Sequence, residues 1–421
     1  MTTPRPRGPS SLVRRVVRRV ARRAGVAGLA GGTLGRDAFA AFRSVDGPTL
    51  VDVAAVTPDP EPAGHGRLVV LVPSLMPDRL TGGPNTALQL GARVAALGVP
   101  VRFVSTHGGV DAIDVLRAHV AGLIGRPVEA IEVTFEAAHG HAATLPIRRG
   151  DVAMATWWPT AYLAERTLAA SGRPDFLYLV QDFEPAFYPW STNYALVMRT
   201  YAMAARPIFN TALLRDHFVL NGIGRPDVAA TSFEPAVDAS LFRRRPSSGP
   251  RRLLFYARPG KPRNAFELGL RALRVAVAAG AFEGKWEFAA IGEPIPDLPL
   301  GKGLVLRATP WRSYADYAAL LGESDVLLSL MLSPHPSYPP LEMAAAGGEV
   351  VTNTFGVKTA AALQQVSPRI HAVEPEVDAL AAALAQAARL PRDGAEVASH
   401  RPTSWAESLG PVAEWVVATS F

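Results

Sequence analysis

Short apolar runs alternate with helix-length segments along most of the chain. The first strong run, RLVVLVPSL at residues 67–75, is nearly continuous in apolar residues and predicts a buried strand. A segment of helical character follows at 84–97, Gly98 ends it, and residues 99–106 form the next predicted strand. Further apolar runs at 151–156, 175–182, 206–211 and 227–233 repeat this pattern. Strands that alternate with helices predict a mostly parallel, doubly wound sheet.

A polar break rich in Pro, Gly and Arg at residues 238–250 interrupts this alternation, which then restarts. Apolar runs follow at 251–259, 286–292, 303–310, 324–332 and 348–355, with helical patterns at 266–280 and 378–390. The sequence therefore predicts an α/β protein with two Rossmann-like, doubly wound domains that face each other across a cleft. We expect an N-terminal segment and linker at 1–44, a first domain at 45–240 and a second at 241–400. A C-terminal helix within 401–421, interrupted at Pro411, is expected to cross back to the first domain.

Composition excludes several classes of site. The 421 residues are 48% hydrophobic and contain no cysteine, so neither disulfides nor thiolate metal sites are available. The nine histidines show no HExxH-like spacing, and we expect no metal site. The formal net charge of +6 comes from the first 24 residues, which hold eight arginines and no acid. Because the rest of the chain is slightly acidic, we do not expect nucleic-acid binding.

The basic N-terminal segment is amphipathic at helical spacing. Between residues 10 and 24, one half of a helix would carry Val, Leu and Ala and the other half only Arg. Such a helix suits an anionic membrane surface, and it is too short and too charged to span one. We therefore expect a cytoplasmic protein attached peripherally to the inner face of the cell membrane. A disordered basic arm or a helix that docks on a partner protein remains the alternative.

The stretch from Leu328 to Ala360 combines a predicted strand, a Pro-rich turn, a helix and another strand. Pro340 suits the first turn of that helix, whose free amides and dipole would suit a diphosphate. Glu342 lies one turn into the helix, where it can accept hydrogen bonds from a ribose or sugar hydroxyl. The alternative is an ordinary βαβ connection with an exposed glutamate.

Three further segments end predicted strands with polar residues. The turn LTGGPNT carries Gly82, Gly83 and Asn85 before a helix, and lacks both the GxGxxG and the GxxxxGK[ST] spacing. In YLVQDFEPAFYPW, Asp182 and Glu184 would share one side of the strand if it continues, beside an aromatic run typical of sugar stacking or of plain packing.

A third segment brings cations to a strand end. After the predicted strand ending at Arg258, Lys261 and Arg263 suit a diphosphate, and Asn264 is expected to cap the next helix. Glu234 follows the last strand of the first domain, where it would contact a ligand or cap a turn. No GxSxG elbow is present, so a Ser/His/Asp hydrolase is a poor fit.

Together these motifs resemble the glycosyltransferase B-fold (GT-B) enzymes, specifically family four and the WsaF-type bacterial rhamnosyltransferases. The resemblance covers residues 65–360 and rests on TGGPNTALQL, QDFEPAFYPW, the FNT at 209–211, FYARPGKPRNAFELGL and LSLMLSPHPSYPPLEMAAAGG. It implies that Arg258 and Arg263 hold the donor diphosphate and that Glu342 binds the nucleotide ribose. The first glutamate of the family's E-x7-E pattern falls on Pro334, so its role would pass to a neighbour such as His335. Further expected donor contacts are Asn210, Ser337, Tyr338, Leu341 and Thr354.

The resemblance implies a retaining glycosyltransferase that moves a sugar, with L-rhamnose from dTDP-L-rhamnose the expected donor, onto a growing bacterial surface glycan or a lipid-linked acceptor. No cofactor and no metal ion are expected beyond the nucleotide-sugar donor. The first domain would bind the acceptor and the second the donor, with Asp182, Glu184, Arg258 and Arg263 as the catalytic residues. A sugar-nucleotide 2-epimerase of the same fold and a non-catalytic scaffold in glycan assembly are the alternatives.

Overall fold

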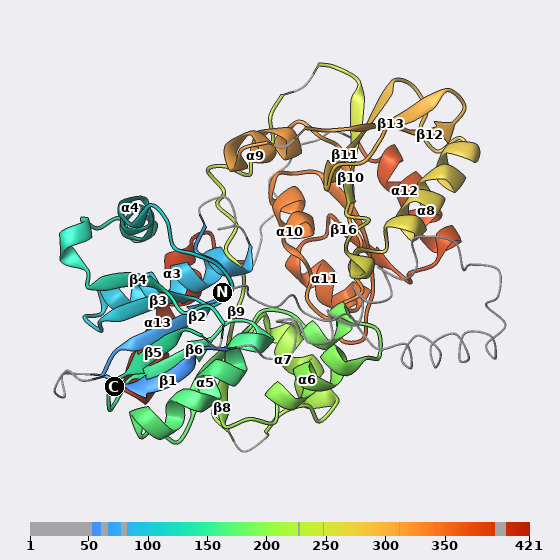
Figure 1. Ribbon diagram of the computed structural model, residues 1–421. Helices are drawn as coiled ribbons and strands as arrows, with labels where there is room; N and C mark the ends of the chain where they lie inside the picture. The colour runs from blue at the N-terminus through green and yellow to red at the C-terminus, as the bar shows by residue number, and fades with distance from the viewer. Residues whose placement is uncertain are drawn as a thin grey trace, which may run out of the picture. The chain divides into compact units, whose positions relative to one another are not determined.

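The computed structural model describes residues 53–59, 66–76, 82–140, 142–225, 228–246, 248–310, 312–391 and 401–421. The predicted amphipathic segment at 10–24 lies outside these residues. The described part contains two seven-stranded sheets and one two-stranded sheet (Figure 1).

The first large sheet is entirely parallel and has the order β4-β3-β2-β6-β7-β8-β9. Its strands are β2 (Leu68–Val72), β3 (Val101–Ser105), β4 (Val133–Ala137), β6 (Val152–Ala155), β7 (Phe176–Val180), β8 (Ala205–Asn210) and β9 (Thr231–Phe233). The helices of this half are α3 (Gly83–Ala96), α4 (Ile113–Leu123), α5 (Trp158–Ser171), α6 (Thr192–Thr200) and α7 (Ala212–Leu220). The central strands are buried at every position, as their continuous apolar runs predict.

The second large sheet has the order β12-β13-β11-β10-β14-β15-β16 and is parallel except at β12. Its strands are β10 (Arg251–Ala257), β11 (Trp286–Gly292), β12 (Leu298–Gly301), β13 (Leu304–Ala308), β14 (Val326–Leu328), β15 (Glu349–Asn353) and β16 (Ile370–Val373). The helices are α8 (Phe266–Ala278), α9 (Tyr314–Gly322), α10 (Tyr338–Ala345), α11 (Ala360–Val366) and α12 (Val377–Arg389). Two doubly wound parallel sheets confirm the predicted fold class.

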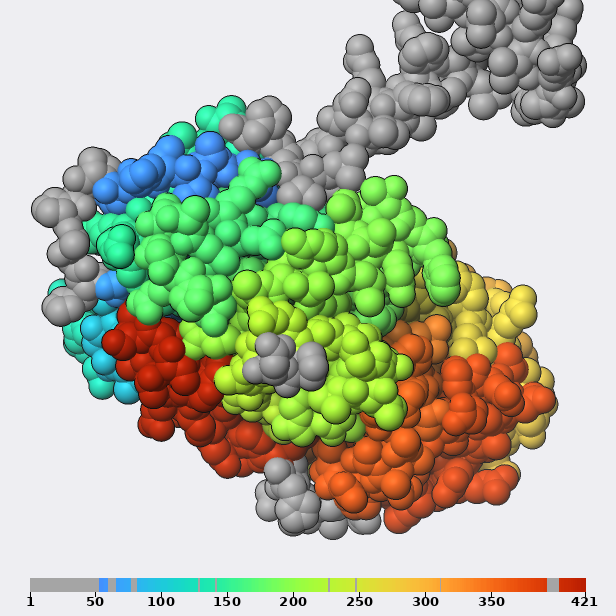
Figure 2. Space-filling model, turned by 90° about the horizontal axis from the view of Figure 1, so that it is seen from below, coloured from blue at the N-terminus to red at the C-terminus, as the bar shows by residue number. Residues whose placement is uncertain are grey.

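The C-terminal helix α13 (Trp405–Ser420) packs against the first half of the fold. Leu409, Val412 and Val416 share a hydrophobic core with β2 and α3, and Figure 2 shows these last residues, in red, against the N-terminal half. The helix continues through Pro411, so the expected interruption there is wrong. Apolar burial of the helix face compensates for the backbone donor that proline lacks.

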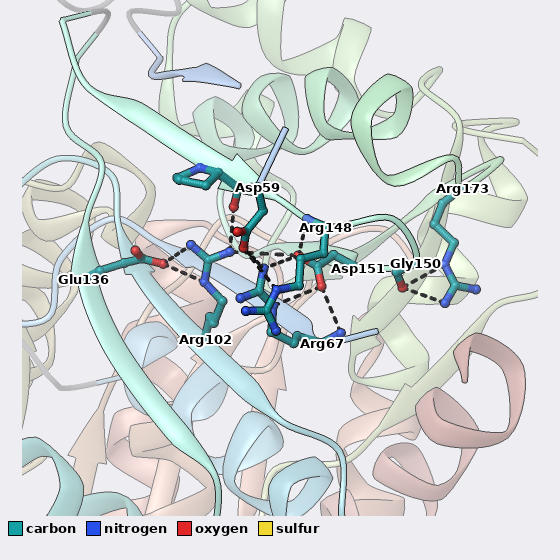
Figure 3. A network of polar contacts seen from close by, with 9 residues as sticks. Asp59, Arg67, Arg102, Glu136, Arg148, Gly150, Asp151 and Arg173 are labelled. Carbon is teal, nitrogen blue, oxygen red and sulfur yellow. Dashed lines mark hydrogen bonds and ion pairs between the residues drawn. The ribbon is translucent and has the colours of Figure 1, made fainter. Parts of the chain in front are cut away.

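A network of buried ion pairs joins the two-stranded sheet, β1 (Ala55–Pro58) and β5 (Thr144–Ile147), to the amino edge of the first large sheet (Figure 3). Asp151 accepts hydrogen bonds from the Arg67 amide at 3.0 Å and from its Nη2 at 2.7 Å. Arg67 and Arg148 both reach Asp59, at 3.0 and 3.1 Å. Arg67 and Asp151 precede β2 and β6, whereas Asp59 and Arg148 follow β1 and β5. The network therefore holds the two-stranded sheet to the edge opposite to the one that carries the candidate site.

Candidate functional site

The carboxyl ends of the two large sheets contact each other through a small set of polar residues. Asp182 follows β7 and Asn210 ends β8 in the first sheet, whereas Ser333 and Tyr338 follow β14 in the second. Asp182, Asn210 and Ser333 are buried, and Tyr338 is half-buried. The carboxyl edge of parallel strands is where ligands of such folds bind, so this contact defines the candidate site.

Asp182 is the most connected residue of the contact. One carboxylate oxygen accepts hydrogen bonds from the Phe183 amide, at 2.8 Å, and from the Ser333 hydroxyl. The other lies 3.5 Å from Nε of Arg263, whose guanidinium also stacks over the Phe187 ring at 4.1 Å. Burial raises the pKa of Asp182, while Arg263 and Ser333 oppose that rise. Asp182 therefore connects the two sheets.

Tyr338 forms a second connection. Its hydroxyl accepts a hydrogen bond from Nδ2 of Asn210 at 3.0 Å and lies 3.3 Å from the hydroxyl of Thr86. Ser337 precedes Tyr338 with a φ of 70°, and Thr211 follows Asn210 with a φ of 95°. Positive φ is unfavourable for both residues, and strain of this kind concentrates at functional sites.

Glu184 does not lie beside Asp182 on a continued strand. The strand β7 ends at Val180, and Glu184 begins the short 3-10 helix η3 (Glu184–Phe187). Its Oε2 accepts a hydrogen bond from the Trp158 amide at 2.8 Å, at the start of α5. Burial raises the pKa of Glu184 to about 8. The expectation that both carboxylates share one side is therefore wrong, because the turn after Val180 redirects Glu184 to a helix terminus.

The Pro-rich loop between β14 and α10 holds His335 in a defined protonation state. Nδ1 of His335 accepts a hydrogen bond from the Ser337 amide at 2.9 Å. Burial, together with the positive charges of Arg401, Lys358 and Arg263, lowers the pKa of His335 to about 3. The neutral ring therefore carries its proton on Nε2, a buried donor with no hydrogen-bond partner among the described residues.

Other buried polar atoms at the same edges are also without partners in the described part of the chain. Oδ1 of Asn210 and Oε1 of Gln181 lie on the first sheet, and Oδ1 of Asn264 lies on the second. A buried polar group without a partner is costly, and native structures hold few of them. At the facing edges, these atoms offer hydrogen-bonding capacity that a polar ligand could use.

The predicted cations line the loop after β10. Arg258 lies 3.6 Å from Glu293, Lys261 is exposed, and Arg263 lies in the short helix η4 (Pro262–Asn264). Asn264 does not cap α8: its Nδ2 donates to the Leu330 carbonyl at 3.0 Å, and Ala265 occupies the cap with a φ of 46°. The capping expectation is wrong because the amide side chain holds the neighbouring strand instead.

Glu342 lies in α10 and is buried. The hydroxyl of Tyr317 donates a hydrogen bond to its Oε2 at 2.8 Å. Burial raises the pKa of Glu342 to about 7, against the hydrogen bonds of Tyr317 and Tyr314. The helix start offers fewer amides than expected, because Pro339 and Pro340 occupy two of its first four positions.

The remaining predicted residues have identifiable places. Gly82, with a φ of 58°, and Gly83 begin α3, and Gly83 lies against Gln181; Oδ1 of Asn85 lies 3.3 Å from Nε2 of His119. Glu234 caps α7 by accepting from the Ala212 amide at 2.9 Å.

Leu341 and Thr354 are placed away from the contact between the sheets. The Leu341 side chain packs in the core of the second sheet, and the Thr354 hydroxyl donates to Glu374 at 2.7 Å. Trp190, the last residue of the aromatic segment YLVQDFEPAFYPW, is 93% exposed and stacks on Tyr194.

Sequence reasoning missed Lys358, which follows β15 and is fully buried. Its ammonium donates to the Met331 carbonyl at 2.6 Å, at the start of the Pro-rich loop. Burial lowers the pKa of Lys358 to about 7, and Asp182 opposes that change. A single lysine after a strand gives no sign of burial, so only its place beyond the carboxyl end of β15 was available as a signal.

The described ranges contain neither a cluster of metal ligands nor a membrane-spanning helix. No group of three or more His, Asp or Glu side chains in the described ranges is arranged to hold a metal ion. No helix in that part of the chain is both long and apolar enough to cross a membrane.

Comparison with known proteins identifies the family. The N-terminal domain of WsaF matches residues 67–212, and the C-terminal domain of WsaF matches residues 251–385. The O-antigen biosynthesis protein RfbC of Myxococcus xanthus is 41% identical over 212 residues, which are 48% of this chain and only 15% of RfbC. The chain thus matches a small part of that relative's length.

Solved structures show the same fold at low identity. HepE of Anabaena, solved with UDP and glucose, has a TM-score of 0.55 at 14% identity and covers 85% of this chain and 97% of its own. Sucrose-phosphate synthase of Thermosynechococcus elongatus has a TM-score of 0.50 at 14% identity, with 87% and 94% covered. The two WsaF domains match in order over the two sheets, so the chain belongs to the WsaF family and has the GT-B fold.

Proposed function

We propose that the chain is a retaining glycosyltransferase that moves L-rhamnose from dTDP-L-rhamnose onto a growing bacterial surface glycan or a lipid-linked acceptor. Membership of the WsaF family supports glycosyl transfer, and the name of the RfbC relative supports a role in O-antigen synthesis. HepE, which shares the fold, has been solved with UDP-glucose, which supports a nucleotide-sugar donor.

The observation that carries the proposal is the unpartnered Nε2 donor of His335 in positively charged surroundings. Arg263, Lys358 and Arg401 all lower the pKa of the His335 ring, so the environment favours an anion over a further cation. A donor diphosphate supplies both the negative charge that this environment favours and an acceptor oxygen for Nε2. The site therefore suits a substrate with a diphosphate beside a sugar.

Each residue has a role in this reaction. Arg258 and Arg263 neutralise the departing diphosphate, Glu342 accepts a hydrogen bond from the ribose, and Asp182 lies on the acceptor side. The bond from the anomeric carbon to the diphosphate breaks, and a bond to the acceptor hydroxyl forms on the same face. The acceptor proton passes to the departing phosphate oxygen, so no enzyme nucleophile and no metal ion are needed in this scheme.

The identity of the sugar is supported by the residue that replaces a family glutamate. Pro334 stands where the E-x7-E pattern has its first carboxylate, so the site holds one acceptor group fewer. A 6-deoxy sugar such as rhamnose has one hydroxyl fewer to bind. This match supports rhamnose over a fully hydroxylated hexose.

The donor is tested first by thermal shift with dTDP, UDP and GDP sugars, since the preferred ligand stabilises the fold by mass action. Donor consumption is then measured for Arg258→Ala, which we expect to turn over at least tenfold more slowly. Arg252→Ala is the matched control, because Arg252 lies at the amino end of β10, the strand that Arg258 follows, and pairs with Glu287 at 3.0 Å. Wild-type turnover in folded Arg258→Ala would remove Arg258 from the site, and the absence of any donor-dependent shift would contradict the proposed activity.

We also propose that residues 10–24 attach the protein to the cytoplasmic face of an anionic membrane, as the Arg-rich amphipathic pattern supports. Deletion of residues 1–30 is expected to move the protein out of the membrane fraction of the cell. An unchanged membrane share after this deletion would refute the attachment.

A further inference from the structure

A row of aromatic and imidazole rings runs along the carboxyl edge of the first sheet. Consecutive ring centroids lie 6.1, 4.8, 6.1, 6.2 and 6.5 Å apart. We call these six residues the ring row; in order they are His139, His107, Trp157, Trp158, Tyr188 and Phe187. Such separations are those of aromatic pairs in contact, so the row is continuous.

The row arises from one repeated position. His139, His107 and Trp157 each lie two residues beyond the last residue of their strand, namely β4, β3 and β6. The strand β2 lies between β3 and β6, and Ser74 occupies its equivalent position. Because serine is small, the rings of His107 and Trp157 can approach to 4.8 Å above it. The parallel register thus brings together rings that are far apart in the sequence.

The ring row combines one buried ring with five rings that are partly or fully exposed to solvent. Trp158 is buried between Trp157 and Tyr188 in the row, and its indole N–H donates to the Tyr188 hydroxyl at 2.9 Å. His107, Trp157, Tyr188 and Phe187 are half-buried, and His139 is exposed. Preorganised rings of this kind lose little conformational entropy when they bind a ligand.

The row leads into the candidate site. Its last ring, Phe187, lies under the guanidinium of Arg263 at 4.1 Å, and Arg263 lies 3.5 Å from Asp182. Asp182 itself occupies the same position, two residues beyond β7. The row and the site are therefore one continuous edge of the sheet.

We propose that the ring row binds the acceptor glycan over several sugar residues. This proposal rests on the proposed glycosyl transfer and adds which residues hold the acceptor and how many of its sugars they contact. The sugar that receives the new unit lies beside Asp182, and the sugars already added lie along Tyr188, Trp157 and His107. The apolar C–H faces of pyranose rings stack on aromatic rings, and imidazole nitrogens exchange hydrogen bonds with sugar hydroxyls. The row thus selects a chain acceptor over a single sugar.

The test compares acceptors of different length. Fragments are prepared by mild acid hydrolysis of the producing cell's own surface polysaccharide and separated by size. In the wild type, we expect the acceptor KM to fall at least tenfold from the shortest to the longest fragments. Trp157→Ala is expected to lose this gain, so that its acceptor KM changes less than twofold from the shortest to the longest fragments. Phe421→Ala is the control, because Phe421 is an exposed aromatic residue outside the row.

Direct binding separates this proposal from the proposed function. Fragment Kd values are measured without donor, by saturation-transfer NMR, on samples whose melting temperature shows that they are folded. If Trp157→Ala does not fold, His107→Ala takes its place, and Trp157→Phe is expected to restore the length dependence. Length-independent Kd values in the wild type, or equal loss in Phe421→Ala, would overturn the ring row even if transfer is observed. Length-dependent Kd values without consumption of any donor would support the ring row and contradict the transferase activity.

Discussion

Replacing Lys358 with methionine is expected to make the protein more stable and less active. The ammonium is fully buried, and burial lowers its pKa from 10.5 to about 7. At a pH at which the lysine is charged in both the native and the unfolded state, a shift of this size corresponds to roughly 5 kcal/mol of native-state destabilisation. Methionine fills the same volume without a charge, and the Met331 carbonyl that loses Lys358 still accepts from Asn353 at 3.1 Å. The lost hydrogen bond costs about 1 kcal/mol, so a net gain of roughly 3 to 4 kcal/mol remains below pH 7.

The pH dependence has a definite sign. Between the native pKa of about 7 and the unfolded value of 10.5, the unfolded state binds more protons. The stability of the wild type therefore rises with pH over this range. The advantage of Lys358→Met is largest at pH 6 and falls by roughly half or more by pH 9, as the native lysine loses its proton.

Thermal unfolding of both proteins at pH 6 and pH 9 measures this difference, and we expect the melting temperature of Lys358→Met to be higher by several degrees at pH 6. Donor consumption is expected to fall at least tenfold, because the Pro-rich loop loses a contact at Met331. Lys285→Met is the matched control, since Lys285 is an exposed lysine at the amino end of β11, away from the candidate site. A variant that is less stable at both pH values, or an advantage that does not change with pH, would refute the burial argument.

Three further substitutions test other parts of the structure. Because burial raises the pKa of Glu184 to about 8, the native state holds its proton between pH 4.5 and 8, and stability falls across that range. Glu184→Gln, whose amide oxygen can still accept from Trp158, should flatten this fall in urea titrations, and an unchanged slope would count against it. Tyr338→Phe loses the hydrogen bond to Asn210, so we expect turnover to fall about tenfold and the free energy of unfolding to fall by about 1 kcal/mol. Unchanged turnover would show that this contact has only a structural role. Asp151→Asn removes one of the two carboxylates that pair with Arg67 and should cost about 1.5 to 3 kcal/mol in chemical unfolding, whereas no measurable loss would contradict this reasoning.

The sequence predicts the strands well because each buried strand is a local apolar run. The run at 67–75 contains β2 (Leu68–Val72), and the helix expected at 84–97 is α3 (Gly83–Ala96). Order and type of the elements follow from such local patterns and from the handedness of βαβ units. The central strands of the two sheets could therefore be predicted without any knowledge of contacts, whereas the edge strands β4, β12 and β16 were not among the predicted strands.

Side-chain positions at strand ends could not be predicted in the same way. Asp182 and Glu184 are two residues apart, yet after the turn at Val180 Asp182 binds Ser333 of the second sheet and Glu184 binds the start of α5. The pattern of alternation applies only while a strand continues, and an apolar run does not mark where hydrogen bonding ends. The burial of Lys358 could not be predicted either, since it depends on residues that are distant from it in the sequence.

Two strained residues indicate that the contact between the sheets is functional. Thr211 and Ser337 belong to different sheets, and each is the immediate neighbour of a residue in the Asn210 to Tyr338 hydrogen bond. Strain of this kind costs about 1 to 3 kcal/mol for each residue, and glycine would relieve it at either position. Packing alone offers no reason for two domains to hold strain at the same contact, because each folds around its own hydrophobic core. A ligand that needs Asn210 and Tyr338 in one arrangement gives such a reason, and we propose that it binds at Oδ1 of Asn210 and Nε2 of His335, which have no hydrogen-bond partner among the described residues.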